Sequence, residues 1–149
     1  MTLPIHIEIT EATIDPQAAT KFVDKRSSGA TVSFVGVVRE VNQGKDVNGV
    51  SYDVYKPMAE KRLLDLASKA MTEHDNKLAI YISHFQGRLD VGGISIVIAV
   101  SSPHRAEAFK VCSQLINDIK HECPIWKQEH YVDGDSEWVQ GHALCQHHD

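Results

Sequence analysis

The chain has 149 residues, of which 42% are hydrophobic and 23% are charged, a size and composition typical of one globular domain with a sizeable core. Its formal net charge of -5 argues against a general nucleic-acid binder, which carries a basic surface. No apolar run reaches membrane-spanning length, and the N-terminal segment lacks the basic and apolar regions of a signal peptide. We therefore expect a single domain over residues 1–149 that is cytoplasmic, with neither a membrane nor a nucleic acid as partner.

The first predicted elements are a strand and a helix. Residues 5–9 alternate isoleucine with polar side chains, which is the pattern of a half-buried strand. Asp15-Pro16 is a typical helix start, because an aspartate caps free N–H groups and proline fits the first turn. Ser27-Ser28-Gly29 is expected to end this helix.

A strand, a loop, a second strand and a second helix follow. Residues 30–38 are rich in β-branched side chains, which favour a strand. The asparagines and glycines between residues 42 and 49 predict turns, and we expect residues 50–55 to pair antiparallel with 30–38 across them. Pro57 begins the next helix, whose apolar stripe consists of Leu63, Leu64, Ala67 and Met71.

The remaining elements complete a mixed fold. Residues 78–85 and 94–100 predict two strands, and a helix over residues 103–120 follows them. The apolar face of that helix consists of Phe109, Cys112, Leu115, Ile116 and Ile119. Asp133-Gly134, between two short alternating runs, is a strong hairpin signal. The sequence therefore predicts an α+β fold in which helices pack on mostly antiparallel strands.

His104 and Arg105 form an unusual start for the last predicted helix. Ser102-Pro103 is a good start signal, with serine as the cap and proline in the first turn. The next two residues are potential cations, whereas the helix macrodipole favours acids at this end. One explanation is a phosphate or carboxylate bound by the free N–H groups and the arginine. The other is that Arg105 pairs with a neighbouring acid such as Glu107 or Glu11, and the sequence leaves both open.

Three further cations lie at the ends of predicted elements. Arg39 follows the strand over residues 30–38, where a solvated charge at the mouth of a loop is the ordinary interpretation. Lys120 falls in the last turn of the helix that Pro124 ends, and Lys127 lies in an alternating run that predicts a strand. Both ammonium groups can therefore reach one pocket from two elements. The alternative is that Lys120 complements the helix C-terminus and that Lys127 is solvated.

The three cysteines do not form a disulfide framework, since their number is odd. Cys112 falls on the apolar face of its helix and is expected in the core. Cys123 lies between two lysines, where positive charge lowers a thiol pKa and makes a nucleophile or sulfur carrier conceivable; the alternative is an ordinary, partly buried thiol. We expect a flexible tail over residues 142–149 rather than a metal site, although it contains possible ligands, namely His142, Cys145, His147 and His148.

Five segments together resemble the family of large, catalytic subunits of molybdopterin synthase. They follow one another with compatible spacing from about residue 29 to residue 141, and it is their combination that is specific. In chain order they are GVVREVNQG (36–44), YDVYKPMAEK (52–61), VSSPHRAEAF (100–109), the pattern K-x-x-x-P-I-W-K-x-E (120–129) and YVDGDSEWVQG (131–141).

The resemblance implies a hammerhead-like α/β fold and a homodimer of this chain. It also implies a small ubiquitin-like sulfur-carrier subunit at each end of that dimer, which makes a heterotetramer. The C-terminal Gly-Gly thiocarboxylate of the carrier would give its sulfur to cyclic pyranopterin monophosphate and so form the dithiolene of molybdopterin. The family's reaction implies no cofactor and no metal ion.

The resemblance also assigns roles by position. It implies that Arg39, His104 and Arg105 bind the phosphate of the substrate. Lys120 and Lys127 would contact the substrate as the catalytic lysines. We assign Lys120 to acid/base work near the reacting carbons and Lys127 to stabilising negative charge, although the two roles could be exchanged. The other pocket residues that the resemblance implies are Val37, Val38, Gln128 and Glu129.

Two other classes of function remain open. One is a persulfide sulfurtransferase that uses Cys123, for which Cys123→Ala would abolish activity. The other is a non-catalytic phosphate-binding or adaptor module, in which the cations only bind. Lys120→Ala would then weaken ligand affinity without any turnover to lose.

Overall fold

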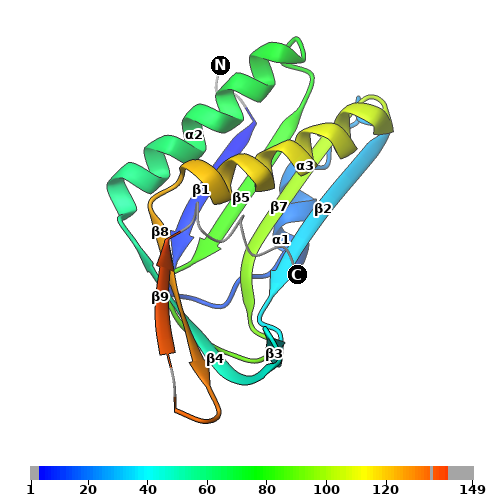
Figure 1. Ribbon diagram of the computed structural model, residues 1–149. Helices are drawn as coiled ribbons and strands as arrows, with labels where there is room; N and C mark the ends of the chain where they lie inside the picture. Colours follow the sequence, from blue (N-terminus) through cyan, green and yellow to red (C-terminus); the bar gives the residue numbers. More distant parts are fainter. Residues whose placement is uncertain (1–3, 135, 141–149) are drawn as a thin grey trace.

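The computed structural model describes residues 4–134 and 136–140. This part of the chain forms two β-sheets and three helices (Figure 1). The first sheet has the strand order β1-β5-β7-β2, made by β1 (Ile5–Thr10), β5 (Ala79–Phe85), β7 (Ile94–Ser102) and β2 (Ala30–Val37). β1 pairs parallel with β5, and the other two pairs are antiparallel. The second sheet is antiparallel and consists of β3 (Val41–Asn42), β4 (Lys45–Val54), β8 (Ile125–Tyr131) and β9 (Ser136–Gln140), with β6 (Gly87–Asp90) beside β4.

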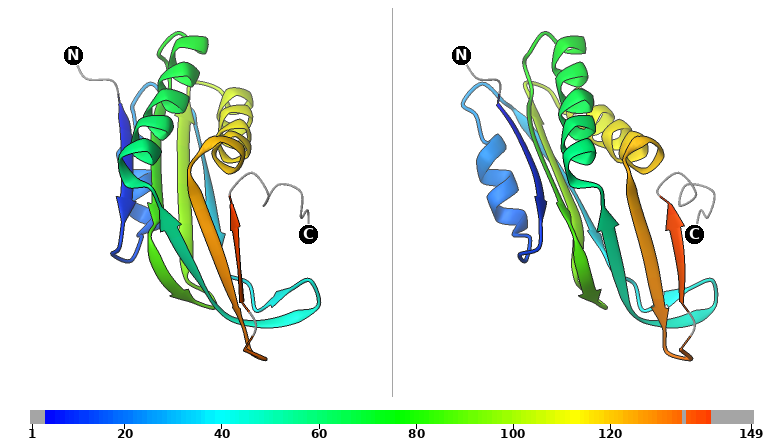
Figure 2. Two further views of the ribbon diagram at one scale, coloured as in Figure 1. Left: turned by 60° about the vertical axis from the view of Figure 1, so that its left-hand side comes forward. Right: turned by 90° about the vertical axis from the view of Figure 1, so that its left-hand side faces the viewer.

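The helices cover the first sheet on both faces. They are α1 (Pro16–Val23), α2 (Lys56–Glu73) and α3 (Arg105–Glu122). α2 and α3 pack on one face and α1 on the other, as the side view in Figure 2 shows. Because the central strands β5 and β7 are covered on both sides, they read as continuous apolar runs rather than alternating ones. None of the described helices is long and apolar enough to cross a membrane.

The α+β class is confirmed, but the expected pairing of residues 30–38 with 50–55 is wrong. β2 pairs with β7, with Ala30 opposite Ser102, whereas β4 pairs with β8, with Val50 opposite Glu129. The chain after β2 crosses to the second sheet, where β3 and β4 form a short hairpin and β4 also pairs with β6 and β8. Strand partners are selected by which faces are buried, and that selection acts over long sequence separations.

Three local predictions also differ from the structure. The glycine-containing turn region after β5 includes a strand, β6, that pairs with β4. Leu64 and Phe109 are 47% and 61% exposed, although both were expected on apolar helix faces. Each follows a fully buried residue, Leu63 and Ala108 respectively, and one step along an α-helix rotates the side chain by about 100°. These two apolar side chains therefore lie outside the core.

His84 is a fully buried histidine at the end of β5. Its Nδ1–H donates to the carbonyl oxygen of Phe85 at 2.8 Å, and its ring meets the edge of the Tyr52 ring at a centroid distance of 5.2 Å. Burial lowers the pKa of His84 from 6.5 to about 4, and the hydrogen bond to Phe85 only partly opposes this. The folded protein therefore holds His84 neutral where an unfolded chain would begin to protonate it.

This histidine should make the protein less stable in mild acid. Well above pH 6.5 His84 is neutral in both states; as the pH falls through 6.5 toward about 4, the unfolded state takes up a proton that the folded state does not bind. The free energy of unfolding should lose about 3 kcal/mol over that range through this group. Urea unfolding at several pH values should show a flatter dependence for His84→Gln, which cannot titrate. An unchanged pH dependence in that variant would contradict this assignment.

Candidate active site

The first turn of α3 places His104 and Arg105 beside an open pocket. The pocket has a volume of about 390 Å³ and is lined by Gly29, Ala30, Pro103, His104, Arg105 and Ala106. A Cβ atom at Gly29 would lie 2.6 Å from the Pro103 carbonyl oxygen, so only glycine lets the two backbones approach this closely. The predicted serine cap is wrong, because Ser102 ends β7 and its hydroxyl donates to the His104 carbonyl, while His104 is the N-cap and makes no capping side-chain bond.

Arg105 has no carboxylate partner within the described residues, so neither Glu107 nor Glu11 forms the salt bridge that was the alternative explanation for its position. The helix start lacks a side-chain cap, which leaves N–H groups of the first turn available to another acceptor. Together with the guanidinium, these groups favour an anion at this pocket.

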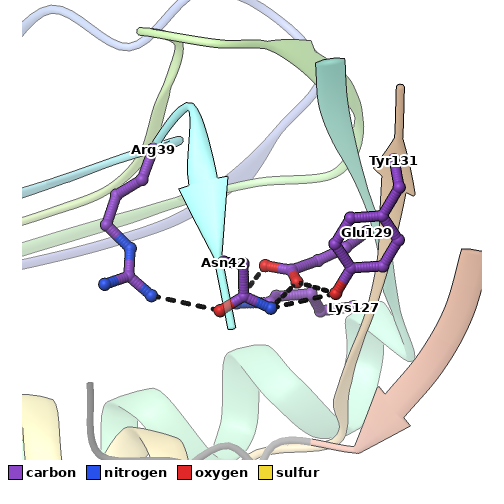
Figure 3. A network of polar contacts seen from close by, with 5 residues as sticks. All are labelled: Arg39, Asn42, Lys127, Glu129 and Tyr131. Atoms are coloured by element: carbon purple, nitrogen blue, oxygen red, sulfur yellow. Dashed lines mark hydrogen bonds and ion pairs between the residues drawn. The ribbon is translucent and has the colours of Figure 1, made fainter. Parts of the chain in front are cut away.

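A second polar site lies between the β3–β4 hairpin and β8, and it contains Arg39, Lys127 and Glu129 (Figure 3). Lys127 Nζ lies 3.2 Å from Glu129 Oε1. The other carboxylate oxygen, Glu129 Oε2, accepts hydrogen bonds from Asn42 Nδ2 and from the Tyr131 hydroxyl, the latter at 2.8 Å. Arg39 Nη2 donates to Asn42 Oδ1 at 3.3 Å. One continuous network therefore joins the arginine after β2 to the lysine on β8.

The alternation of β8 explains why three of these side chains share a face. Lys127, Glu129 and Tyr131 are two residues apart in a strand, so they point the same way. Glu129 is only 8% exposed, and a carboxylate this buried requires a cation and hydrogen-bond donors around it. Burial raises the pKa of the Tyr131 hydroxyl, and the bond to Glu129 and its charge add to this effect. Tyr131 is therefore a protonated donor to the carboxylate.

Lys120 lies at the same end of α3 as this network. As predicted, it is in the last helical turn, and the helix ends at Glu122 because Cys123 takes an extended conformation before Pro124. Only Cys123 and Pro124 separate α3 from β8. The Lys120 side chain is exposed and makes no hydrogen bond or ion pair within the described part of the chain. It is therefore available to a ligand.

The structure does not bring Arg39 together with His104 and Arg105 in one chain. The register of β2 puts Ala30 beside Ser102 and Val37 beside Ile94, so Arg105 lies near the start of β2 and Arg39 lies beyond its end. Eight strand residues span roughly 25 Å. Within one chain, the antiparallel pairing of β2 with β7 therefore separates Arg39 from His104 and Arg105.

Two of the other expected pocket residues face elsewhere. Gln128 points to the face of β8 opposite Lys127, and its Nε2 donates to Ser136 Oγ at 2.9 Å. Val38 is buried, and its backbone N–H and C=O are already bonded to Gly93 and Gly92 at 2.9 and 2.8 Å. Val37 is 52% exposed at the end of β2. Of this group, Val37 is open to a ligand, whereas Glu129 is buried with both carboxylate oxygens bonded inside the network.

Asn42 and Tyr131 are members of the network that sequence reasoning missed. Tyr131 had a weak signal, since K-x-E-x-Y on a predicted strand places all three side chains on one face. For Asn42 the sequence contains no signal of this role beyond its position in a turn-rich segment. Its contact with Glu129 depends on a fold that joins residues 87 positions apart.

Cys123 is an ordinary buried thiol, one of the two alternatives that the sequence left open, and not a reactive one. It is 3% exposed, and burial raises its pKa to about 12, an effect that the Arg62 charge opposes only in part. A thiol with this pKa is almost entirely protonated at neutral pH, whereas the thiolate is the nucleophile. Cys112 is buried in the core as predicted.

If the chain transfers sulfur as the resemblance implies, Cys123→Ala should leave turnover within about twofold of the wild type, because a buried, protonated thiol is not a nucleophile. Loss of a buried side chain should cost about 1 kcal/mol in the free energy of unfolding. Steady-state kinetics and thermal melting measured on the same preparation test both expectations. Complete loss of activity in a folded variant would instead support the persulfide mechanism.

Within residues 4–134 and 136–140 no group of three or more metal-ligating side chains is assembled. The histidines and cysteine of residues 142–149 lie outside the described residues. The polar sites described above are thus built from cations, amides, hydroxyls and one carboxylate.

Comparisons with known proteins show which family the chain is similar to. A family model described as MoaE protein matches residues 9–122. A curated "Molybdopterin synthase catalytic subunit" of Synechococcus elongatus is 41% identical over 140 residues, which cover 94% of this chain and 85% of that protein. A crystal structure of molybdopterin synthase from Staphylococcus aureus superposes with a TM-score of 0.83 at 36% identity, covering 89% of this chain and 95% of that one.

A more distant structure has the same fold. It is a complex of subunits 1 and 2 of molybdopterin-converting factor from Helicobacter pylori, and its matching chain has a TM-score of 0.69 at 22% identity, covering 90% of this chain and 88% of that one. The family model spans most of the chain, and the Synechococcus protein matches it nearly end to end. This chain therefore belongs to the MoaE protein family.

Proposed function

We propose that this chain is the catalytic subunit of a molybdopterin synthase. It takes sulfur from the C-terminal thiocarboxylate of a small ubiquitin-like carrier and transfers it to cyclic pyranopterin monophosphate, forming the dithiolene of molybdopterin, in the cytoplasm. Membership of the MoaE family and the names of its relatives support this function. The observation that carries it is the convergence of Arg39 and Lys127 on one network through Asn42 and Glu129.

The chemistry requires positive charge and proton transfer at one place. Opening a cyclic phosphate leaves negative charge that an arginine neutralises by bidentate hydrogen bonds. Lys127 is held by Glu129 with its side chain 23% exposed, so its ammonium is oriented before substrate arrives and can stabilise developing negative charge. The exposed Lys120 is the group that moves protons at the reacting carbons. The immediate neighbour of Lys127 is therefore the Glu129 carboxylate, whereas the sequence suggested that other cations would surround this lysine.

A second copy of the chain can complete the site. β2 is an edge strand of the first sheet in the described part of the chain, yet it exposes Phe34, Val35 and Val37 by 37%, 38% and 52%. An apolar sheet edge of this kind is normally covered. A homodimer in which two β2 strands meet would bury it.

The symmetry of such a contact determines which cations meet. A two-fold contact is isologous, and when its axis is perpendicular to β2 the two β2 strands run in opposite directions, as in an antiparallel strand pair. The start of β2 in one copy then lies beside the end of β2 in the other. His104 and Arg105 of one chain are thereby brought toward Arg39 of its partner, and the phosphate site expected from the sequence is formed by two chains.

The sulfur donor is a separate protein in this proposal. In this proposal the carrier's extended Gly-Gly tail enters between Lys120 and Lys127, whose ammonium groups meet the thiocarboxylate. Glycines suit such an entry because they carry no side chain. One carrier at each end of the homodimer gives a heterotetramer. The Helicobacter pylori protein of the same fold was solved as a complex of two subunits, which is consistent with this arrangement.

The direct test mixes the purified chain with a thiocarboxylated carrier and cyclic pyranopterin monophosphate and assays for molybdopterin. Product should form with full-length carrier and should not form with carrier that lacks its last two glycines. The truncated carrier should also fail to protect Lys120 from chemical modification. Absence of product with full-length carrier, in the presence of measurable substrate binding, would favour the non-catalytic binding module instead.

A further inference from the structure

Asn42 connects a cation to an anion across the candidate active site. Its Oδ1 accepts a hydrogen bond from Arg39, while its Nδ2 donates to Glu129 Oε2 and to the Tyr131 hydroxyl, the latter at 3.0 Å (Figure 3). The opposite orientation of the amide would set Oδ1 against the carboxylate and NH₂ against the guanidinium. The charges on the two sides therefore fix the amide in one orientation.

The backbone around Asn42 is built to present this side chain. Asn42 pairs with Lys45 at the end of the β3–β4 hairpin, and the two residues between them, Gln43 and Gly44, have positive φ values of 51° and 78°. Two positive φ values in a two-residue turn are typical of a type I′ hairpin. Such a turn fixes the strand pairing of Asn42 with Lys45, and so fixes the face of the hairpin from which the Asn42 side chain projects.

The same hairpin contacts β8 a second time. Lys45 Nζ lies 5.2 Å from the centroid of the Tyr131 ring and 3.9 Å from Asp133 Oδ2. The Tyr131 ring thus contacts the Lys45 ammonium of the hairpin, and its hydroxyl donates a hydrogen bond to Glu129. The side chains of Asn42 and Lys45 therefore attach the segment that carries Arg39 to Tyr131 and its neighbours, in addition to the backbone pairing of β4 with β8.

We propose that Asn42 is a positioning residue for the sulfur-transfer site. Its hydrogen bonds hold the Arg39 segment against Glu129, and the Tyr131 hydroxyl bonds to both Asn42 and Glu129. Arg39 and Lys127 are thereby directed toward the same substrate. The proposal rests on the function proposed above and adds a specific role to a residue that does not itself react. The path guanidinium, amide, carboxylate, ammonium alternates donors and acceptors at every step. An uncharged side chain with both a donor and an acceptor is the type that fits between Arg39 and Glu129.

Asn42→Ala should raise the KM for cyclic pyranopterin monophosphate about tenfold with a smaller change in kcat, because it removes the hydrogen bond that orients the phosphate-binding arginine toward Lys127. Asn42→Asp has almost the same shape but sets a second carboxylate against Glu129, and it should cost at least as much. The matched control is Asn48→Ala on β4. Asn48 Oδ1 also accepts from an arginine, Arg88 Nη2, at 3.2 Å, but it has no contact with the network, and this variant should behave as wild type.

A double-mutant cycle separates positioning from simple structural support. In an Arg39→Ala background, Asn42→Ala should change KM by less than about twofold, because the arginine that it positions is gone. An equal loss in both backgrounds would overturn the proposal. So would a wild-type KM in Asn42→Asp, since that result would mean that only the volume of the side chain matters.

Amide hydrogen exchange decides the proposal independently of turnover. Residues 39–45 should exchange faster in Asn42→Ala than in wild type or in Asn48→Ala, because one attachment to β8 is lost. If the wild-type chain made no molybdopterin, the proposed function would fail, whereas faster exchange in Asn42→Ala would still support the attachment. Equal exchange in all three proteins would overturn it.

Discussion

Lys127→Ala should lower the turnover number of sulfur transfer by about 10²- to 10⁴-fold, and Lys120→Ala should do the same. Lys127 supplies an oriented ammonium next to the buried Glu129 carboxylate, and Lys120 is an exposed lysine in the adjoining helical turn. Single-turnover measurement of molybdopterin formation gives the chemical step directly. Circular dichroism and thermal melting show whether each variant remains folded.

The two lysines should differ in what a substitution by arginine does. Arginine keeps the positive charge but does not release a proton near neutral pH. Lys127→Arg should therefore retain more activity than Lys127→Ala if the residue stabilises charge. Lys120→Arg should be as impaired as Lys120→Ala if that residue moves protons. The reverse pattern would exchange the two roles.

Lys110→Ala is the matched control for Lys120, because Lys110 is also an exposed lysine of α3 and lies away from β8. It should keep wild-type turnover. Lys127→Ala is expected to melt at a lower temperature, since it leaves the Glu129 carboxylate with hydrogen bonds but without a cation. Near wild-type turnover in either alanine variant would remove that lysine from the catalytic assignment.

Two inactive variants should restore activity when they are co-expressed. Arg105→Ala and Lys127→Ala alter opposite ends of the site that two copies are proposed to share. In a mixed dimer, one site receives Lys127 from one chain and Arg105 from the other, and both are intact. Random pairing makes half of the dimers mixed, with one working site each, so the mixture should recover about a quarter of wild-type activity.

The control for this experiment pairs two variants on the same end of the chain. Arg39→Ala and Lys127→Ala both alter the network of Figure 3, so each site of a mixed dimer lacks one of them and activity should stay low. Recovery in the control as well would mean that the effect is not specific to shared sites. No recovery with Arg105→Ala and Lys127→Ala, despite mixed dimers seen by native mass spectrometry, would show that each chain carries a complete site.

The sequence by itself determined the elements whose signals are local. The end of α3 before Pro124 and the strand carrying Lys127 were predicted from proline and from alternation, since both effects act within a few residues. The α+β class and the family were also evident from the order of elements and motifs. The start of α3 was predicted less accurately, because His104 rather than Ser102 is its N-cap.

Only the tertiary structure decided which distant residues meet. Pairing of β4 with β8 brought Asn42 to Glu129, and pairing of β2 with β7 separated Arg39 from Arg105. Packing buried Cys123 and so raised the pKa of its thiol, contrary to the effect expected of neighbouring lysines. Strand pairing and burial are set by free energies summed over the whole core, and no short segment of sequence contains them.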